Sequence, residues 1–311
     1  MDFKVSKPKV ICLSGPTASG KTALSFLLAK HLDIEIISAD AVQVYRGLDI
    51  GSAKPTPEER RKVPHFLVDV CDIGTRFDVS AWHKEATDAL RGILKKGKVP
   101  VVVGGAGFYI DSLLYGLSQA PPSSSRVVKQ VEERLKKHGA QKMYSLFCDI
   151  DPEHASTIHP NDHYRLVRAW SIFLQTGNPV SHYQRLVNQE FQFNTWILEW
   201  DREILYQRIN QRCIEMMDRG LLLETRELMD EGTIFSNSSA RTAIGYKHAI
   251  SHLKGELKEF LPIFQRDSRR YAKRQGLWFR KWEGARSLRI DDSRESMDVA
   301  IQEVISRYTD Q

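Results

Sequence analysis

The sequence predicts an α/β fold in which helices flank a parallel sheet, with an all-helical domain inserted into it. Short apolar runs alternate with stretches that repeat apolar residues at helical spacing, the pattern of a parallel sheet with crossover helices. Near residue 120 the composition shifts to that of a linker, and the pattern beyond it is helical. We therefore predict a core made of residues 1–119 and 194–311, whose last part is helical and basic, and a helical insertion over 120–193.

Composition fits a cytosolic, enzyme-sized protein. The 311 residues are 41% hydrophobic, enough to bury a large core. No run approaches the roughly 18–20 apolar residues of a membrane span, and the first residues lack the layout of a signal peptide. The four cysteines, Cys12, Cys71, Cys148 and Cys213, are scattered, which favours reduced thiols over a disulfide or a zinc site.

The strongest motif is a phosphate loop over residues 15–22, which matches the pattern G-x-x-x-x-G-K-[ST] in full. A buried strand is predicted before it, over 10–14, and a helix after it, over 23–32, as in a P-loop NTPase-like core. Backbone N–H groups can converge on a phosphate there, Lys21 adds positive charge, and the Thr22 hydroxyl can ligate Mg²⁺. By itself the motif is typical of ATP or GTP enzymes and does not indicate whether the phosphate is transferred or leaves. The residues expected to bind phosphate are Gly15, Pro16, Thr17, Ala18, Ser19, Gly20, Lys21 and Thr22.

Polar or glycine-rich segments follow two further strands of the predicted sheet. Asp40 comes soon after the strand predicted over 35–38, and a glycine-rich turn, 104–109, follows the strand over 98–103. Ligands of parallel α/β sheets bind outside the carboxyl ends of the strands, so we expect both segments to face the phosphate loop. The other predicted elements are a functional loop over 43–55, strands over 64–70 and 195–200, and helices over 80–94, 127–138, 162–175 and 201–218.

Positive charge is concentrated near the end of the chain. Residues 266–289 hold nine Lys or Arg against two acidic residues, a net charge of +7 in a chain of net charge +6. Such a segment suggests a polyanionic partner. Four of its cations share one predicted helix face, and three aromatic rings share an adjacent one, which suits nucleic acid. The cations are Arg270, Lys273, Arg274 and Lys281, and the rings are Tyr271, Trp278 and Trp282. The alternative is a solvated basic face beside rings packed in the core, and for the rings alone we prefer it.

Seven motifs follow one another along the chain. After the phosphate loop they are Asp40-x-x-Gln43-Val44-Tyr45-Arg46-Gly47, Asp49-Ile50-Gly51-Ser52-Ala53-Lys54-Pro55, Gly104-Gly105-x-Gly107-Phe108-Tyr109, His159-Pro160-Asn161-Asp162-x-x-Arg165-x-x-Arg168-Ala169, Arg241-x-x-x-Gly245-Tyr246 and Lys273-Arg274-Gln275-x-x-Trp278. In this order they resemble the bacterial-type tRNA dimethylallyltransferases, also called tRNA isopentenyltransferases. The resemblance covers nearly the whole chain. It departs from the family at Ala41 and Ala106, where serine and threonine are usual.

The resemblance implies transfer of a dimethylallyl group from dimethylallyl diphosphate to the exocyclic amine of the adenosine 3′-adjacent to the anticodon in tRNA. Diphosphate would be released, with Mg²⁺ held by Thr22. Thr17 and Arg212 would contact the diphosphate and Asp40 would take the proton of the amine, which makes these three the expected catalytic residues. The alternatives are a magnesium-shell carboxylate for Asp40 and an ordinary surface ion pair for Arg212.

The target base must leave the anticodon-loop stack, and enzymes of this kind flip such a base and bind its edge. Gln43 is the family's candidate for that contact, because a carboxamide both donates and accepts; its alternative role is to stabilise the loop. We expect the chain to be a monomer and to have no membrane partner. The residues predicted to bind the tRNA anticodon stem-loop are Asp40, Ala41, Val42, Gln43, Ala106, Tyr164, Arg165, Arg168, Arg241, Lys247, Arg270, Lys273, Arg274 and Lys281.

Three other functions are open at this point. An adenylate isopentenyltransferase would use a free nucleotide, but it needs neither the insertion nor the basic segment. A phosphate-loop kinase would need an acceptor site and a nucleotide-base pocket, for which no motif is seen. A diverged tRNA-binding paralogue with reduced catalysis would explain Ala41 and Ala106 as marks of lost activity.

Overall fold

The computed structural model of the chain describes residues 7–186 and 190–309. The chain divides into two compact units, one made of Met1–Leu114 with Gln189–Gln311 and the other of Tyr115–Asn188. The sequence places the insertion at 120–193, so each of its boundaries lies a few residues later than in this division. Among the described residues, no helix is long and apolar enough to cross a membrane.

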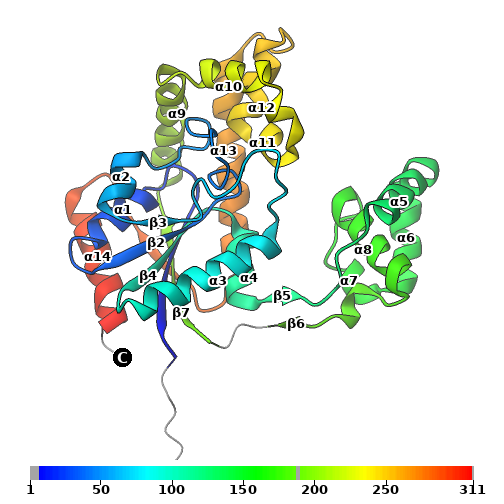
Figure 1. The fold of residues 1–311 in the computed structure, drawn as a ribbon, viewed down its shortest axis with the longest axis horizontal. Helices are drawn as coiled ribbons and strands as arrows, with labels where there is room; N and C mark the ends of the chain where they lie inside the picture. Colours follow the sequence, from blue (N-terminus) through cyan, green and yellow to red (C-terminus); the bar gives the residue numbers. More distant parts are fainter. Residues whose placement is uncertain (1–6, 187–189, 310–311) are drawn as a thin grey trace, which may run out of the picture. The chain divides into compact units, whose positions relative to one another are not determined.

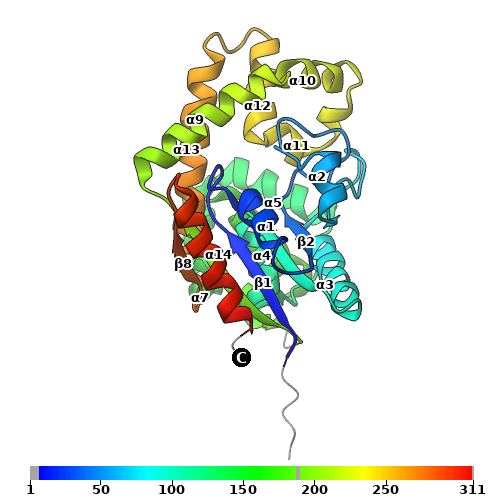
Figure 2. The ribbon, with the colours of Figure 1, turned by 90° about the vertical axis from the view of Figure 1, so that its left-hand side faces the viewer.

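The first unit is built on a six-stranded sheet with the order β3-β2-β4-β1-β7-β8 (Figures 1 and 2). All of its pairings are parallel, and β1 lies between β4 and β7 near the centre. This confirms the predicted α/β fold class. The strands are β1 (Lys9–Ser14), β2 (Ile34–Ala39), β3 (His65–Phe66), β4 (Val99–Gly104), β7 (Gln192–Glu199) and β8 (Arg286–Arg289).

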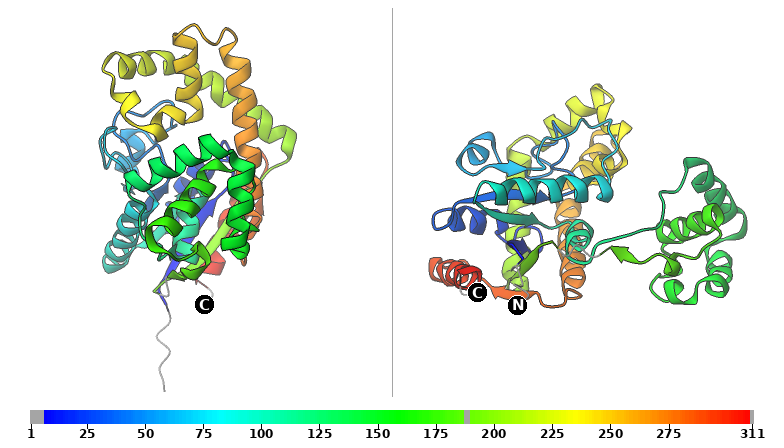
Figure 3. Two further views of the ribbon diagram at one scale, coloured as in Figure 1. Left: turned by 90° about the vertical axis from the view of Figure 1, so that its right-hand side faces the viewer. Right: turned by 60° about the horizontal axis from the view of Figure 1, so that its bottom comes forward.

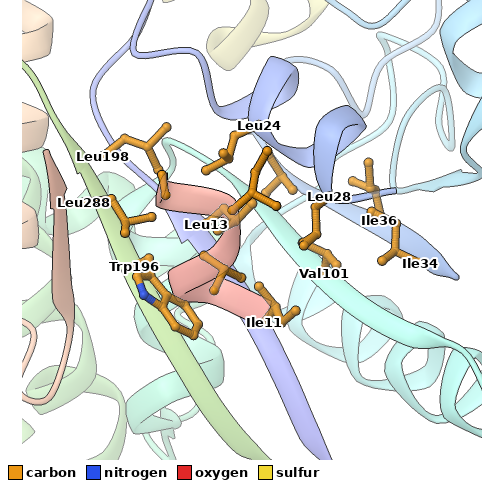
Figure 4. Close-up of a cluster of buried hydrophobic side chains, with 14 of the residues drawn as sticks. Ile11, Leu13, Leu24, Leu28, Ile34, Ile36, Val101, Trp196, Leu198 and Leu288 are labelled. Carbon is orange, nitrogen blue, oxygen red and sulfur yellow. The ribbon is translucent and has the colours of Figure 1, made fainter. Parts of the chain in front are cut away.

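Apolar side chains on one face of the sheet form the main core, shown in Figure 4. Ile11 and Leu13 of β1 meet Leu24 and Leu28 of the helix α1 (Lys21–Leu28), and all four are almost fully buried. Each such side chain contributes roughly 1.5–3 kcal/mol through burial. The carboxyl-terminal helix α14 (Arg294–Thr309) packs into the same cluster. Helix α3 (Val79–Lys95) contacts β2 and β4 through residues outside this cluster, and α4 (Gly107–Tyr115) follows β4.

A helical part of the first unit follows β7. Helix α13 runs along α9 and α12, and α10 packs against α12 (Figures 1 and 2). The predicted helix over 201–218 is confirmed, with Asp201 as its N-cap, because the Asp201 carboxylate accepts from the N–H groups of Glu203 and Ile204. The helices are α9 (Arg202–Asp218), α10 (Leu221–Asp230), α11 (Ser238–Thr242), α12 (Ile244–Leu253) and α13 (Phe260–Phe279); α2 (Pro57–Lys62) is a short helix before β3.

The second unit has its own small core, formed by Val131, Phe147, Leu166 and Trp170 with their neighbours. Figure 3 shows its helices in green. It also contains a two-stranded antiparallel sheet, which the sequence analysis did not predict because strands of two residues leave no readable periodicity. Its elements are β5 (Leu117–Ser118), α5 (Ser125–His138), α6 (Ala140–Ile150), α7 (Pro152–Ala155), α8 (His163–Thr176) and β6 (Arg185–Leu186).

The predicted strand over 64–70 is wrong beyond its first residues. Only His65 and Phe66 form β3, because Leu67 and Asp69 adopt φ of 62° and 56°, in the left-handed region that ends a strand. The turn brings the Asp69 carboxylate to Lys54, whose amine lies 2.6 Å from it and whose side chain is only 2% exposed. A buried cation requires such a partner. The apolar run therefore turns where Asp69 pairs with a buried lysine that lies 15 residues before it in the sequence.

Glu224 of α10 holds the loop of residues 49–51. Its carboxylate accepts from the backbone N–H groups of Asp49, Ile50 and Gly51 at 2.8–3.2 Å. The Tyr246 hydroxyl donates to the same carboxylate at 2.7 Å. A Cβ at Gly51 would lie 2.5 Å from the Tyr246 ring, so glycine is required there. One carboxylate thus ties the predicted functional loop to the helical part of the unit.

We expect Glu224→Ala to lower the free energy of unfolding by about 2–3 kcal/mol, because three backbone donors and a buried phenol lose a charged acceptor. Urea unfolding measures this loss. The matched control is Glu227→Ala on the exposed side of the same helix, which should change the unfolding free energy by less than about 0.5 kcal/mol. Equal effects of the two substitutions would contradict the role given to Glu224.

Candidate active site

A cleft of about 1050 Å³ opens at the carboxyl ends of β1, β2 and β4 in the first unit. The phosphate loop, the segment after β2 and the second glycine-rich turn all line it, so the structure brings together the three segments that strand order predicted. Side chains of α9 and α13 complete the wall. The residues that line the cleft include Thr17, Ser19, Lys21, Thr22, Asp40, Gln43, Ala106, Arg212, Tyr271, Arg274 and Gln275.

Neighbouring side chains hold the phosphate loop from outside. The Trp200 indole donates to the carbonyl of Ser19 at 2.9 Å, and the Arg208 guanidinium donates to the carbonyl of Ala18 at 3.1 Å. Ala18 adopts φ of 62° and Gly20 φ of 84°, so both lie in the left-handed region that a tight turn uses. Helix α1 then begins at Lys21, with its N-terminus at the cleft. This is the arrangement of an anion-binding loop.

Two groups of the loop indicate a polar ligand. The Ser19 hydroxyl is buried and has no hydrogen-bond partner among the described residues. The Lys21 amine donates to the carbonyls of Gly15 and Pro16 at 2.9 and 2.8 Å. Burial, with the positive charge of Arg212 as a second cause, lowers the pKa of Lys21 to about 7, while the Asp40 carboxylate acts in the opposite direction. An anion bound in the loop would restore the charged form of this lysine.

The two arginines of α9 have different surroundings. Arg208 is neutralised by Asp292, with 2.5 Å between their charged atoms, and its guanidinium lies over the Trp200 ring. Arg212 lines the cleft and forms no ion pair with any acidic side chain among residues 7–186 and 190–309. Burial lowers the pKa of Arg212, and the Asp40 carboxylate opposes this shift. The surface ion pair considered for Arg212 is therefore found at Arg208 instead.

Asp40 begins the segment that follows β2. Its Oδ1 accepts from the backbone N–H groups of Val42 and Gln43 at 2.8 and 3.2 Å, which fixes the side chain over the turn. None of the described residues donates a hydrogen bond to its Oδ2. Asp40 and Arg212 line the same cleft. The carboxylate is therefore held by one oxygen and has the other available to a ligand.

Gln43 lines the cleft, but both ends of its carboxamide are hydrogen-bonded within the protein. Its Oε1 accepts from the Ser38 hydroxyl at 2.9 Å, and its Nε2 donates to the carbonyls of Ser52 and Ala53 at 3.2 and 3.3 Å. These bonds correspond to the loop-stabilising role that was the alternative for this residue. Its predicted contact with a base stays a prediction, and such a contact requires that some of these bonds be exchanged.

Some of the basic and aromatic side chains of α13 and the residues after it line the cleft, and others do not. Arg274 and Tyr271 line the cleft, with the guanidinium 5.8 Å from the ring centroid. The indoles of Trp278 and Trp282 instead both donate to the Asp111 carboxylate, and Trp282 is buried beyond the end of the helix. The core-packed alternative therefore applies to Trp282. Trp278 is half-buried and does not line the cleft, whereas Tyr271 does. Of the predicted cations, Lys273 and Lys281 are exposed, and Arg270 is exposed but pairs with Asp267.

The remaining residues predicted to bind tRNA lie on both units. In the second unit, Tyr164 is 82% exposed at the start of α8, and Arg165 is exposed and pairs with Asp162 at 3.4 Å. Arg168 donates to Ser123 and to the carbonyl of Pro121, which anchors the segment before α5. In the first unit, Arg241 and Lys247 are exposed on α11 and α12, while Ala41, Val42 and Ala106 line the cleft.

Sequence reasoning gave no role to several residues that shape the cleft. Trp200, Arg208 and Glu224 act through backbone carbonyl and N–H groups, which leave no motif of their own. Gln275 stood within a motif, beside two expected cations, but nothing in that pattern indicates what its carboxamide contacts. A glutamine in the middle of an amphipathic helix was the one available signal, since burial of an amide demands partners.

The comparisons with known proteins agree with one another. The family model "IPP transferase" matches residues 43–282, and the model "Isopentenyl transferase" matches residues 8–73. A tRNA dimethylallyltransferase of Protochlamydia amoebophila is 43% identical over 93% of this chain and 86% of its own length. One of Salinibacter ruber is 38% identical over 94% of this chain and 93% of its own.

Solved structures resemble the chain as well. The full-length tRNA isopentenylpyrophosphate transferase of Bacillus halodurans matches 98% of this chain and 99% of its own, with a TM-score of 0.70 and 34% identity. A eukaryotic dimethylallyltransferase acting on tRNA matches 96% of this chain and 78% of its own, with a TM-score of 0.80 and 26% identity.

The surroundings of Lys21 predict a pH-dependent affinity for inorganic diphosphate. With a pKa of about 7 in the free protein and a higher one beside a bound anion, Lys21 is charged in both states below pH 7. Above pH 7 binding must take up a proton, so the affinity falls by up to about tenfold per pH unit. Calorimetry at pH 8 in two buffers of different ionisation enthalpy measures this uptake. Lys21→Arg, whose charge does not titrate, is the control, and equal proton uptake by both proteins would contradict the prediction.

Proposed function

The chain belongs to the IPP transferase family, and from this membership we propose how its cleft acts as a tRNA dimethylallyltransferase. The reaction moves a dimethylallyl group from dimethylallyl diphosphate to the exocyclic amine of the adenosine 3′-adjacent to the anticodon. A carbon–nitrogen bond forms, the bond from the first prenyl carbon to oxygen breaks, and diphosphate leaves with the electron pair. The observation that carries the proposal is one cleft that holds an anion-binding loop, an unpaired arginine and a carboxylate.

The phosphate loop supports the departure of diphosphate rather than the transfer of a phosphoryl group. Negative charge grows on the leaving oxygen as the bond to carbon breaks, and fixed positive groups stabilise that charge. Backbone N–H groups at the start of α1, the Lys21 amine and the Arg212 guanidinium are such groups, and all line the cleft. Arg212 suits bidentate binding of phosphate oxygens, because no acidic side chain of the described residues competes for it. Thr17, also on the cleft wall, is a further group that we assign to the diphosphate.

The residues present fit a Mg²⁺ ion bound together with the diphosphate. The Thr22 hydroxyl is exposed in the cleft and is the hard oxygen ligand that we assign to Mg²⁺. The Asp40 carboxylate lines the same space and is the alternative ligand. The described residues contain no cluster of three or more His, Cys, Asp or Glu side chains. Substrate phosphates and water would therefore complete the coordination, as is usual for this ion. When bound, the ion neutralises charge on the leaving diphosphate.

Asp40 is the group we assign to the acceptor amine. As the amine nitrogen attacks carbon it becomes acidic, and its proton passes to a base within hydrogen-bond reach. The Asp40 Oδ2 is the available atom, because Oδ1 is occupied by the N–H groups of Val42 and Gln43. The same two bonds keep the carboxylate in one orientation.

Each unit, taken by itself, has positive or aromatic side chains that we assign to tRNA binding. The first unit offers Arg241, Lys247, Lys273, Arg274 and Lys281, all exposed, and the second offers Tyr164 and Arg165 at the start of α8. Lysine and arginine at such positions neutralise backbone phosphates, and an exposed ring can stack on a base. The relatives that carry tRNA in their names match more than nine-tenths of this chain, which disfavours an enzyme of free adenylate or a kinase.

The transfer itself is tested by incubating the protein with labelled dimethylallyl diphosphate, Mg²⁺ and unmodified tRNA, followed by digestion to nucleosides. We expect label in prenylated adenosine and one diphosphate released per label transferred. Free adenosine monophosphate replaces tRNA in a parallel reaction. Label in the free nucleotide alone would assign the protein to the adenylate enzymes, and binding of tRNA without label would leave a paralogue without catalysis.

Asp40→Asn should lower kcat by about 10²–10⁴-fold without weakening the binding of diphosphate or tRNA. An asparagine Oδ1 still accepts the bonds from Val42 and Gln43, so the turn is kept while the base is lost. The matched control is Asp78→Asn, because Asp78 accepts from two backbone N–H groups in the same way at the start of α3. Unchanged turnover in Asp40→Asn would overturn the base role. Recovery at high Mg²⁺ concentration would assign Asp40 to the metal instead.

A further inference from the structure

We infer that Gln275 is a positioning residue that sets the spacing between the two glycine-rich turns of the cleft; this rests on the proposed function. Gln275 lies on α13 and is only 6% exposed. Its Oε1 accepts from the backbone N–H of Thr17 at 2.8 Å, and its Nε2 donates to the carbonyl of Gly105 at 2.9 Å. One carboxamide therefore bridges the phosphate loop after β1 and the turn after β4.

The Gln275 amide packs tightly against the backbone of the second glycine-rich turn. A Cβ at Gly105 would lie 2.3 Å from the Gln275 Nε2, so the amide can reach that carbonyl only past a glycine. The same Cβ would lie 3.6 Å from the carbonyl oxygen of Gly15, which shows how near the two turns come to each other. The amide is thus wedged between two backbone segments and is bonded to both.

The two segments belong to opposite sides of the proposed reaction. The Thr17 side chain is assigned to the diphosphate of the donor, and Ala106, next to Gly105, lines the wall where the acceptor base is expected. A displacement of about 1 Å between reacting groups can cost on the order of 10²-fold in rate. Gln275 touches neither substrate in this scheme. It acts by holding Thr17 and the Gly105 turn at the distance that the displacement requires.

Only a side chain that has a hydrogen-bond acceptor for the Thr17 N–H and a donor for the Gly105 carbonyl can form this bridge. Glutamate in its ionised form accepts from Thr17 but places a second oxygen against the carbonyl of Gly105. In its protonated form it restores both bonds, because the acid hydroxyl can donate to that carbonyl. Methionine fills a similar volume and makes neither bond. The pair of substitutions therefore separates the hydrogen bonds from the space that the side chain fills.

The experiment measures kcat, the dissociation constant of tRNA and that of inorganic diphosphate for Gln275→Glu and Gln275→Met, relative to wild type, from pH 5.5 to 9. We expect Gln275→Met to lose on the order of 10²-fold in kcat at every pH and to bind diphosphate more weakly, with tRNA affinity within threefold of wild type. For Gln275→Glu we expect the kcat ratio to approach one at low pH and to fall as the carboxyl ionises. The control is Gln265→Glu on the same helix, where Gln265 donates to the carbonyl of Asn210 away from the cleft, and its ratio should not depend on pH.

Thermal unfolding of each variant completes the test. A kcat of Gln275→Met within threefold of wild type, or a kcat ratio of Gln275→Glu that does not change with pH, overturns the inference. A lower melting temperature with unchanged kcat and diphosphate affinity in the folded protein also overturns it, since the role is then only structural. An inactive wild type refutes the proposed function alone. In that case, weaker diphosphate binding by Gln275→Met still supports the positioning of the phosphate loop, and equal binding refutes it.

Discussion

The parallel register of β1, β2 and β4 is the constraint on which the cleft depends. Ser14 of β1 and Ala39 of β2 both pair with Gly104 of β4, so the three strands end at the same level. Each strand then turns into a segment of the cleft wall, and the three segments begin as neighbours. A Cβ at Gly104 would lie 2.1 Å from the carbonyl of Ala39, so only glycine permits this close approach. The site is thus a consequence of where strands stop, and the helices α9 and α13 add side chains to a frame already set.

Two kinds of positively charged side chain occur in the first unit: those paired with carboxylates, which hold the backbone in place, and those left for a ligand. Lys54 and Arg208 meet carboxylates, at 2.5–2.6 Å, and each holds a backbone segment in place. Lys21 and Arg212 have no carboxylate within salt-bridge distance in the described part of the chain. Partly buried cations without acidic partners are costly unless an anion completes them. The cleft is therefore built for a ligand that brings its own negative charge.

Much of the fold was predictable because its signals are local. Buried runs before residues 14 and 104 gave β1 and β4, and the amphipathic pattern over 201–218 gave α9. The strand predicted over 64–70 failed for the opposite reason. The strand is shortened because Leu67 and Asp69 adopt left-handed backbone conformations. Asp69 thereby pairs with Lys54, and no local sequence pattern indicates this contact. The positions of Trp278 and Trp282 likewise depend on hydrogen bonds to Asp111, which lies 167 and 171 residues away from them in the sequence.

The sequence by itself determined that a phosphate loop ends one strand, that Asp40 and a glycine turn end two others, and that the chain resembles one family of transferases. Those statements need only spacing and order along the chain. The tertiary structure alone decided that Arg208 pairs with an acidic side chain while Arg212 does not, that Tyr271 rather than the tryptophans lines the cleft, and that Gln275 bridges the two turns. Such choices depend on hydrogen bonds between segments that are far apart in sequence. Each polar group takes whichever partner the fold brings within about 3 Å, and a one-dimensional pattern does not contain that distance.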